Sequence, residues 1–286
     1  MMKSILVFSA LLAVALALPE ASIYEATNTP SDIRNISTNL QIVNGLNAAR
    51  GQFPYQVSVQ RQRVILGFSH ICGGTIISQN WILSAAHCTP LGNTYRIVAG
   101  ILLQLDQNVA GQQEIAVTQV INHPGYPGNN VVAPDDVSIL RLARQLVYGV
   151  NVQPARIPAA NYVASGTAVL SGWGITVPGG SVPNHLQFAR LPVVSERECN
   201  TILTNFLGSR NPFDIDRNVC SGTVNGGESA CSGDSGGPYF QNGRVVGIVN
   251  WVLTPCGARG APSVYAKTAA YASWIVQNTN GEVQPL

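Results

Sequence analysis

The chain has 286 residues, of which 46% are hydrophobic and 10% charged, and its formal net charge is +2. The charged fraction lies well below the roughly 25% of an average soluble domain, which excludes a disordered chain, since such chains are rich in charge and poor in apolar residues. The near-neutral balance excludes broad electrostatic attraction to nucleic acid or to an anionic membrane.

The chain begins with the pattern of a secretory signal peptide. Lys3 supplies a positive charge, residues 5–18 are apolar or small, and Ala15 and Ala17 form the small-x-small pattern of a signal peptidase site. The apolar run is shorter than the ~20 residues of a membrane-spanning helix, so an N-terminal anchor is the weaker alternative. We assign residues 1–17 to a signal peptide and expect a secreted, extracellular protein without membrane contact after signal removal.

A polar, turn-rich stretch follows and predicts a propeptide over residues 18–41. It has little hydrophobic periodicity and carries the one N-glycosylation sequon of the chain, Asn35-Ile36-Ser37. We therefore expect the working domain to span residues 42–286.

The six cysteines are disulfide candidates because export brings the chain into an oxidising environment. Six cysteines allow 15 pairings, and the sequence alone does not choose among them. A metal site built from His70, Cys72, His87 and Cys88 is the alternative, but the chain lacks the paired C-x-x-C spacing of structural zinc sites. We expect neither a metal nor another cofactor.

From Ile42 onward, short apolar or alternating runs separated by turns predict β-strands. The runs are residues 55–59, 75–83, 95–98, 114–121, 137–142, 168–171, 244–251 and 263–266. The one helical pattern comes last, where Tyr271, Trp274, Ile275 and Asn278 recur at helical spacing. About 245 residues exceed what one small barrel needs, so we predict an all-β fold of two stacked units that join near residues 148–158.

The most informative motif is Gly233-Asp234-Ser235-Gly236-Gly237. Small neighbours leave a serine hydroxyl accessible and let backbone N–H groups approach a substrate carbonyl, although a structural glycine turn has the same composition. The nucleophile elbow of α/β-hydrolases is also similar, but those enzymes need a histidine after the serine, and the last histidine is His185. The subtilisin order needs an acid before His87, where the only acids lie in the predicted leader and propeptide. The order His, Asp, Ser remains.

Three stretches carry a family resemblance in that order. They are Ala85-Ala86-His87-Cys88, Asp135-Asp136-Val137-Ser138-Ile139-Leu140 and Cys231-Ser232-Gly233-Asp234-Ser235-Gly236-Gly237-Pro238, preceded by Ile42-Val43-Asn44-Gly45. Together they resemble the signatures of the chymotrypsin-family serine peptidases, from residue 42 to about residue 278. The resemblance implies two packed six-stranded antiparallel β-barrels with a C-terminal α-helix, and the activity of a secreted serine endopeptidase.

The resemblance also implies a role for each residue of a catalytic triad. His87 would take the proton of Ser235 and return it to the leaving amine, while Asp136 would hold the imidazole tautomer. We prefer Asp136 to its neighbour Asp135 because the family has its acid directly before the Val-Ser-Ile-Leu strand. The N–H groups of Gly233 and Ser235 would form the oxyanion hole. We expect the other histidines to be surface or packing residues: His70, His123 and His185.

Disulfide pairs and an activation switch follow from the same resemblance. The pairs are Cys72 with Cys88, Cys199 with Cys220, and Cys231 with Cys256. Cleavage before Ile42 would free an amine that pairs with Asp234, so we expect a zymogen. Most relatives have Arg or Lys before the cleaved bond, whereas here Gln41 stands there. We therefore expect an activating protease of non-tryptic specificity, or a second trimming step.

By the family's spacing, the base of the primary specificity pocket lies at Ser229, where cleavage after Arg or Lys would require an acid. Glu228 is one residue away, and that one-residue shift turns it off the pocket. Asn250-Trp251-Val252 stands where relatives usually have Ser-Trp-Gly, and Ser263 stands at a wall position that is Gly in deep-pocket relatives. Side chains at the two glycine positions predict an elastase-like preference for small or medium apolar residues, and a chymotrypsin-like preference for Leu, Phe or Tyr is the alternative.

A non-catalytic homologue that acts as a binding or regulatory protein is the alternative from another class, and the complete set of triad residues argues against it. Asp106 and Glu114 lie in the loop where some relatives hold calcium, but two such acids are more often solvated. We expect a monomer whose partners are protein or peptide substrates and an activating protease.

Overall fold

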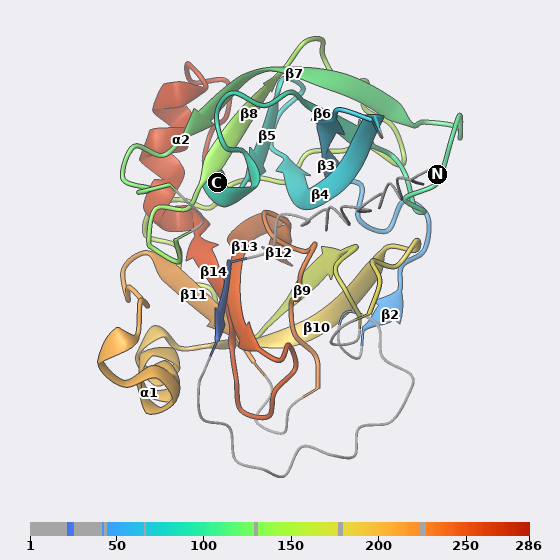
Figure 1. Ribbon diagram of the computed structural model, residues 1–286. Helices are drawn as coiled ribbons and strands as arrows, with labels where there is room; N and C mark the ends of the chain where they lie inside the picture. The colour runs from blue at the N-terminus through green and yellow to red at the C-terminus, as the bar shows by residue number, and fades with distance from the viewer. Residues whose placement is uncertain are drawn as a thin grey trace, which may run out of the picture.

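The computed structural model describes residues 22–25, 42, 45–65, 67–128, 131–176, 180–222 and 227–286, and strands dominate these residues (Figure 1). The predicted signal peptide, the glycosylation sequon and Gln41 lie outside the described residues. Among the described residues, no helix has the length and the hydropathy required to cross a membrane.

The first barrel consists of six antiparallel strands that close in the order β3-β4-β5-β8-β7-β6. Its strands are β3 (Gln56–Arg63), β4 (Gly67–Ile76), β5 (Trp81–Ser84), β6 (Tyr95–Ala99), β7 (Gln113–Asn122) and β8 (Ser138–Leu142). Buried β-branched side chains fill the interior, because such residues pack well on a pleated surface: Val57, Val59, Ile76, Ile82, Ile97 and Ile139.

The second barrel follows the order β9-β10-β11-β14-β13-β12, and the pairing of β12 with β9 closes it. Its strands are β9 (Thr167–Gly172), β10 (Gln187–Val194), β11 (Asn218–Ser221), β12 (Pro238–Gln241), β13 (Arg244–Thr254) and β14 (Ser263–Lys267). Two short strands add to its outside: β2 (Leu46–Asn47) pairs with β10, and β1 (Ser22–Glu25) runs parallel to β13. The prediction of two six-stranded antiparallel barrels is confirmed.

The C-terminal helix is also confirmed. A 3-10 turn, η3 (Thr268–Tyr271), leads into α2 (Ala272–Asn278), and the buried Tyr271 and Ile275 pack into the hydrophobic core of the first barrel. The prediction that this is the one helix is wrong, because α1 (Glu196–Leu207) is longer and lies between β10 and β11. Further 3-10 turns are η1 (Ala86–Cys88) and η2 (Gly208–Arg210).

One predicted strand is also wrong. Residues 75–83 form the end of β4, a turn, and the start of β5 rather than a continuous strand. The apolar run continues through the turn because Ile77 is buried there as well. Three barrel strands had no counterpart in the prediction, β10, β11 and β12, and neither did the short outer strands β1 and β2.

Three disulfides join the pairs that the family resemblance implies. They are Cys72–Cys88, Cys199–Cys220 and Cys231–Cys256, and the described residues contain no free cysteine. The first ties β4 to η1, and the second ties α1 to β11. Each closes a loop that the unfolded chain would otherwise leave open, a constraint typically worth about 2–4 kcal/mol.

The two barrels meet along β4 and β12. Ser171 donates a 2.8 Å hydrogen bond to the side-chain oxygen of Gln56, and the rings of Tyr55 and Phe240 stack with their centroids 4.2 Å apart. At Gly73 the approach is closer still, since an added Cβ would lie 2.8 Å from the Cα of Gly237. The backbones of the two barrels therefore touch beside the motif that contains Ser235.

Candidate active site

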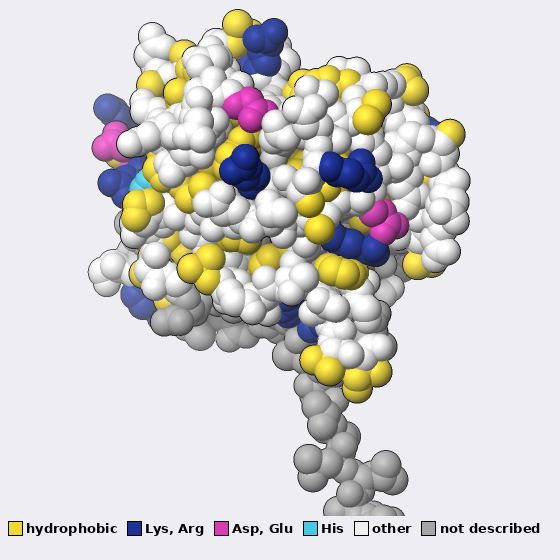
Figure 2. Space-filling model, turned by 90° about the horizontal axis from the view of Figure 1, so that it is seen from above, with side chains coloured by type: hydrophobic (Ala, Val, Ile, Leu, Met, Phe, Trp, Pro, Cys, Tyr) yellow, Lys and Arg dark blue, Asp and Glu magenta, His cyan; other side chains and the backbone are white. Residues whose placement is uncertain are grey.

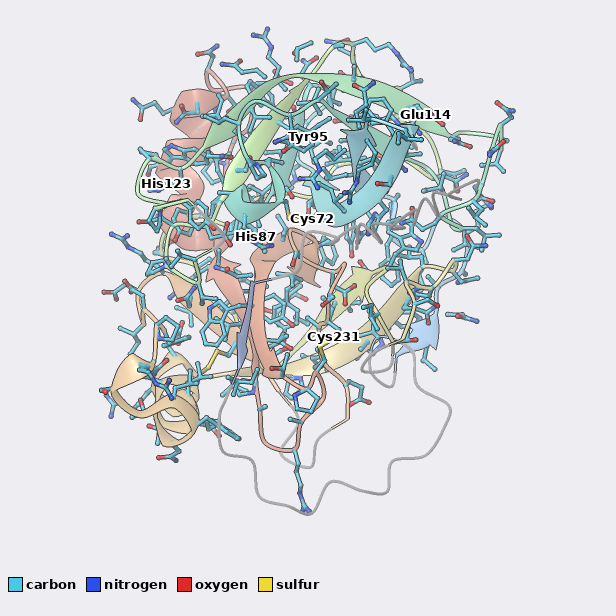
Figure 3. All side chains as sticks on the ribbon, viewed as in Figure 1. Cys72, His87, Tyr95, Glu114, His123 and Cys231 are labelled. Atoms are coloured by element: carbon cyan, nitrogen blue, oxygen red, sulfur yellow. A yellow bond between two sulfur atoms is a disulfide. The ribbon has the colours of Figure 1, made fainter. Side chains whose placement is uncertain are left out.

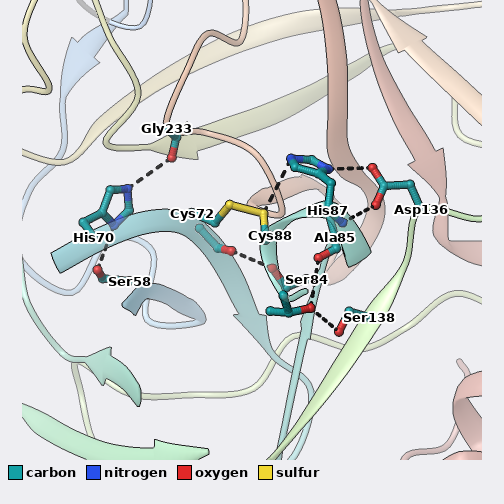
Figure 4. The surroundings of a disulfide bond; sticks show 12 residues. Ser58, His70, Cys72, Ser84, Ala85, His87, Cys88, Asp136, Ser138 and Gly233 are labelled. Atoms are coloured by element: carbon teal, nitrogen blue, oxygen red, sulfur yellow. Dashed lines mark hydrogen bonds and ion pairs between the residues drawn. A yellow bond between two sulfur atoms is a disulfide. The ribbon is translucent and has the colours of Figure 1, made fainter. Parts of the chain in front are cut away.

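His87 and Asp136 are brought together by two neighbouring strands of the first barrel. His87 lies on η1 directly after β5, Asp136 directly precedes β8, and β5 pairs with β8 so that Ser84 faces Ser138. Asp136 Oδ2 lies 2.6 Å from His87 Nδ1, and Asp136 Oδ1 accepts a 2.8 Å bond from the His87 backbone N–H (Figure 4). Both side chains are buried, so this hydrogen-bonded pair is shielded from water.

The neighbouring acid, Asp135, points elsewhere. Its carboxylate pairs with Arg217 and lies 3.6 Å from His123 Nδ1. The structure therefore brings Asp136, and not Asp135, against His87.

The turn that carries Ser235 comes from the second barrel and lies against Gly73 and Ser84 of the first barrel. The Gly73 N–H in β4 donates a 2.8 Å hydrogen bond to the Ser235 carbonyl oxygen, which links the serine turn to the strand that carries Cys72. Gly236 has φ +73°, and an added Cβ would lie 2.2 Å from Ser84 Oγ, so the turn fits against the first barrel only with glycine there. Ser235 Oγ is buried and has no hydrogen-bond partner among the described residues, which leaves its hydroxyl uncommitted.

The backbone around Ser235 leaves two donors free. The N–H groups of Asp234, Gly236 and Gly237 all donate to backbone carbonyls. Among the described residues, the N–H groups of Gly233 and Ser235 have no acceptor. These are the two donors that an oxyanion hole requires.

His70 contacts the same turn, which the sequence prediction missed. Its Nε2 lies 3.2 Å from the Gly233 carbonyl oxygen and its Nδ1 lies 2.8 Å from Ser58 Oγ (Figure 4). Burial lowers the pKa of His70 to about 4, so the ring is neutral at physiological pH. His70 packs edge-on against Trp173, and His123 packs edge-on against Tyr271 and Trp274, as expected of packing residues. The contact of His70 with Gly233 was not predicted.

Asp234 is a fully buried acid. Its carboxylate accepts hydrogen bonds from the N–H groups of Gly174, at 2.8 Å, and Cys231, at 3.0 Å. Burial raises the pKa of Asp234 to about 7, and these two N–H groups oppose the rise. Ile42 is also fully buried, in a hydrophobic cluster with Cys231.

The predicted pocket residues gather at one end of the second barrel. Val252 in β13 and Ser263 in β14 are partners across the two strands. Ser263 Oγ accepts a 3.0 Å hydrogen bond from the Ala230 N–H, and Ser229 Oγ donates a 2.9 Å bond to the Ala230 carbonyl. Trp251 and Asn250 are both buried, and the two polar atoms of the Asn250 side chain have no partner among the described residues.

The residues considered for metal binding are already engaged. Sulfur atoms of Cys72 and Cys88 lie near a His87 ring nitrogen, but the two cysteines form a disulfide and offer no thiolate. Asp106 pairs with Arg50, and Glu114 pairs with Arg96 on the far side of the first barrel from His87 (Figure 3). Neither acid is free to ligate calcium without breaking an ion pair.

The face of the molecule in Figure 2 carries isolated basic side chains with acidic ones nearby and no basic stripe. This distribution agrees with the small net charge of the sequence.

Comparisons with known proteins match nearly the whole described domain. The family model described as Trypsin matches residues 42–275. The chain is similar to Trypsin-1 of Astacus astacus, with 36% identity over 83% of this chain and 99% of the relative, and to Trypsin I-P1 of Gallus gallus, with 37% identity over 82% and 88%. It is also similar to Chymotrypsin-like elastase family member 1 of Felis catus, with 36% identity over 83% of this chain and 89% of the relative. Since the identities to trypsins and to this elastase are nearly equal, the pocket residues carry the argument about specificity.

Proposed function

Since this chain belongs to the trypsin family and is a serine-type endopeptidase, we propose that it hydrolyses peptide bonds through Ser235, His87 and Asp136. We also propose that it is secreted as a zymogen. Its proposed preference is for small or medium apolar residues before the cut bond. The observation that carries the proposed triad is the paired hydrogen bonding of Asp136 to the ring and backbone of His87. Each part of the proposal rests on a different group of residues.

In the proposed reaction, the hydrogen bond between His87 and Asp136 fixes the tautomer of the ring. A proton on Nδ1 donates to Asp136 Oδ2 across 2.6 Å, which leaves Nε2 unprotonated and able to accept the proton of Ser235 Oγ. Ser235 Oγ then bonds to the substrate carbonyl carbon. When the tetrahedral intermediate collapses, the Nε2 proton passes to the leaving amine and an acyl-enzyme remains. Water then bonds to the acyl carbon while His87 Nε2 takes a proton from it. The second intermediate collapses as that proton passes to Ser235 Oγ, which breaks the ester bond and releases the acid.

Negative charge develops on the substrate carbonyl oxygen during each attack. The free N–H groups of Gly233 and Ser235 are the donors proposed to stabilise it, and one such donor is typically worth about 3–4 kcal/mol of transition-state energy. The hydrogen bond from His70 to the Gly233 carbonyl supports this arrangement, because a neutral His70 that donates from Nε2 restrains the orientation of the adjoining peptide.

Activation is proposed to depend on Asp234. In the uncut chain burial raises the pKa of this carboxylate, its two N–H donors oppose the rise, and no cation contacts it among the described residues. Cleavage before Ile42 would supply an ammonium group to Asp234, and an opposite charge at close range favours the ionised carboxylate. With Gln41 before that bond, the proposed activator is a protease of non-tryptic specificity.

The proposed specificity rests on the uncharged residue at the proposed pocket base and on the side chains at two positions of the proposed wall. Ser229 offers a hydroxyl rather than a carboxylate to a substrate side chain, so a cationic side chain would lose its water without gaining a counter-ion. Val252 and Ser263 add side chains to adjacent strand positions of the wall. The expected substrates are therefore proteins or peptides cut after small or medium apolar residues.

The proposed nucleophile is tested with a chain that begins at Ile42 and a fluorophosphonate or sulfonyl fluoride label. We expect one label per molecule, located on the peptide that contains Ser235 by mass spectrometry, and none on Ser235→Ala. Ser232→Ala is the matched control, because it changes a serine of the same turn and should keep the label. An unlabelled wild-type chain would contradict the proposed triad and favour a non-catalytic homologue, and a label that persists on Ser235→Ala would contradict the assignment of the nucleophile.

A further inference from the structure

A second buried acid lies beside the proposed catalytic one. Asp135 directly precedes Asp136, and its side chain is only 9% exposed. An added Cβ at Gly125 would lie 2.2 Å from Asp135 Oδ2, so the loop at Gly125 covers this carboxylate. Two carboxylates on adjacent residues, both buried, repel each other and both favour a cationic His87 unless one of them is neutralised.

The groups that face Asp135 come from three parts of the chain. His123 follows β7, Arg217 precedes β11, and Tyr271 belongs to η3; the Tyr271 hydroxyl oxygen accepts a 3.1 Å bond from the Asp135 N–H. Tyr126, whose pKa is raised by burial and by Asp136, and Asp214, which lies 3.8 Å from Arg217 Nε, complete the titratable groups of this corner. Arg217 and His123 are therefore the possible sources of positive charge.

His123 is not a cation near neutral pH. Its Nδ1 accepts a 3.2 Å hydrogen bond from the Gly125 N–H, which requires an unprotonated nitrogen at that position. Burial lowers the pKa of His123, with Asp135 opposing that effect and Arg217 adding to it. Among the described residues, Arg217 is thus the one cation that contacts the Asp135 carboxylate at neutral pH.

The backbone couples Asp135 to Asp136. The Val137 N–H donates a 2.8 Å hydrogen bond to the Asp135 carbonyl oxygen, which closes a three-residue turn with Asp136 at its centre. Asp135 itself has φ +67°, a left-handed conformation that non-glycine residues adopt at some cost. The ion pair with Arg217 and the bond to Tyr271 hold Asp135 in that conformation, so the same contacts fix the turn that presents Asp136.

We propose that Arg217 is a positioning residue for the triad. Arg217 neutralises Asp135, so that His87 responds to the charge of Asp136 alone, and it anchors the turn that carries Asp136. The inference rests on the proposed triad, since it assumes that protonation of His87 ends activity at low pH. It assigns a role to a residue that is 46% exposed and lies in the second half of the chain, 82 residues from its partner.

The test is the pH profile of kcat/KM for a peptide substrate, measured on the chain that begins at Ile42. The acidic limb of this profile is the fall of kcat/KM at low pH, where His87 becomes protonated. In Arg217→Gln the unpaired Asp135 favours a cationic His87, so we expect the acidic limb to shift to higher pH by about one unit. In Asp135→Asn, Arg217 keeps only its longer pairing with Asp214 and has the opposite effect on His87, so the limb moves to lower pH. In the double variant Asp135→Asn/Arg217→Gln neither charge is present, and the limb returns to the wild-type position. Arg217→Lys keeps the charge and should keep the limb.

Arg50→Gln is the matched control. Arg50 is 40% exposed and pairs with the buried Asp106, so the substitution removes the same charge from a similar pair and should not move the limb. A limb that stays in place in Arg217→Gln, or that remains displaced in the double variant, overturns the inference. If Arg217→Gln does not fold, the comparison of Asp135→Asn with the double variant decides, and an unmoved limb in Asp135→Asn overturns it. A wild-type chain without activity would instead refute the proposed function.

Discussion

At the scale of single residues, the proposed pocket makes a specific prediction about substrate size. Val252 and Ser263 are strand partners, and Ser263 also accepts the Ala230 N–H at the pocket base. In Val252→Gly/Ser263→Gly we expect kcat/KM for substrates with Phe or Tyr before the cut bond to rise about 10- to 200-fold relative to substrates with Ala or Val. Cleavage of a diverse peptide pool, followed by mass spectrometry, measures both preferences.

Wild-type enzyme in the same assay is the reference. Dominant cutting after Arg or Lys by the wild type would contradict the argument from Ser229, and dominant cutting after Phe or Tyr would favour the chymotrypsin-like alternative. An unchanged ratio in the double variant would mean that these two side chains do not limit the pocket.

Asp234 gives a prediction about pH and stability in the uncut chain. An ordinary aspartic acid has a pKa near 3.9, whereas burial raises the pKa of Asp234 to about 7. A raised carboxyl pKa means that the folded state binds the proton more tightly, so the stabilisation is complete at low pH and is lost as pH rises towards 7. We expect the precursor to lose on the order of 4 kcal/mol from this group between about pH 4 and 7.

Urea unfolding of a Ser235→Ala precursor, which cannot cut itself, measures that loss. Adding Asp234→Asn should remove this part of the pH dependence, since an amide does not titrate. In the chain that begins at Ile42, the same Asp234→Asn change should abolish activity because the proposed ammonium partner is lost. Equal pH slopes in the two precursors would contradict the buried, unpaired state of Asp234.

The residues of the proposed triad have local sequence signals, whereas the two residues that the sequence prediction missed have none. His87, Asp136 and Ser235 sit in short motifs, because the strand ends and the glycine turn that carry them are local structures. His70 and Arg217 sit in no motif. Their roles arise from contacts across 163 residues, from His70 to Gly233, and across 82 residues, from Arg217 to Asp135, and one sequence contains no signal for such contacts.

At the scale of elements, α1 depends on its first residues. Ser195 caps the helix, where its side chain accepts the Glu198 N–H, and Cys199, Leu203 and Leu207 form the buried stripe. Ser195→Ala should lower the free energy of unfolding by about 1 kcal/mol and the Tm by about 2–4 °C. Thermal unfolding measures the change, and kcat/KM should stay the same because α1 contributes no residue to the proposed site.

Ser209→Ala is the control, since Ser209 is exposed in η2 and caps no helix. A Tm that falls equally in both variants, or that does not fall in Ser195→Ala, would contradict the capping role.

The missed elements have identifiable causes. The capping box Ser195-x-x-Glu198 and apolar residues at four-residue steps could have predicted α1. β10 contains Arg190 and Pro192, which interrupt a strand pattern, and β11 and β12 have only four residues each. Such strands are stable because both neighbours in a closed barrel supply hydrogen bonds, and that support is not visible in a local run of residues. The longer runs, such as β3 and β7, carried enough apolar residues to be predicted.

At the scale of the whole molecule, activity depends on how closely the barrels approach each other. An added Cβ at Gly73 would meet Gly237 of the other barrel, whereas one at Gly74 would lie 2.9 Å from Ile82 inside the first barrel. Gly73→Ala should push the Ser235 turn away from His87 and lower kcat by about 100-fold, because misplacement of ~1 Å has that effect. Gly74→Ala should lower stability by about 1–3 kcal/mol through overpacking and largely spare kcat.

Burst titration, which counts active molecules, separates these effects when it is combined with urea unfolding. The two adjacent glycines form a matched pair, and equal losses of kcat per active molecule in both variants would contradict the role assigned to the contact between the barrels.

The division of the proposed triad between two separately closed barrels also bears on how this protease is removed. His87 and Asp136 belong to one barrel and Ser235 to the other, so a copy that opens either barrel loses its catalytic centre at once. The same opening exposes strands whose apolar side chains suit the proposed pocket of an intact copy. An unfolded copy of this chain would therefore be a substrate of the proposed specificity for an intact copy.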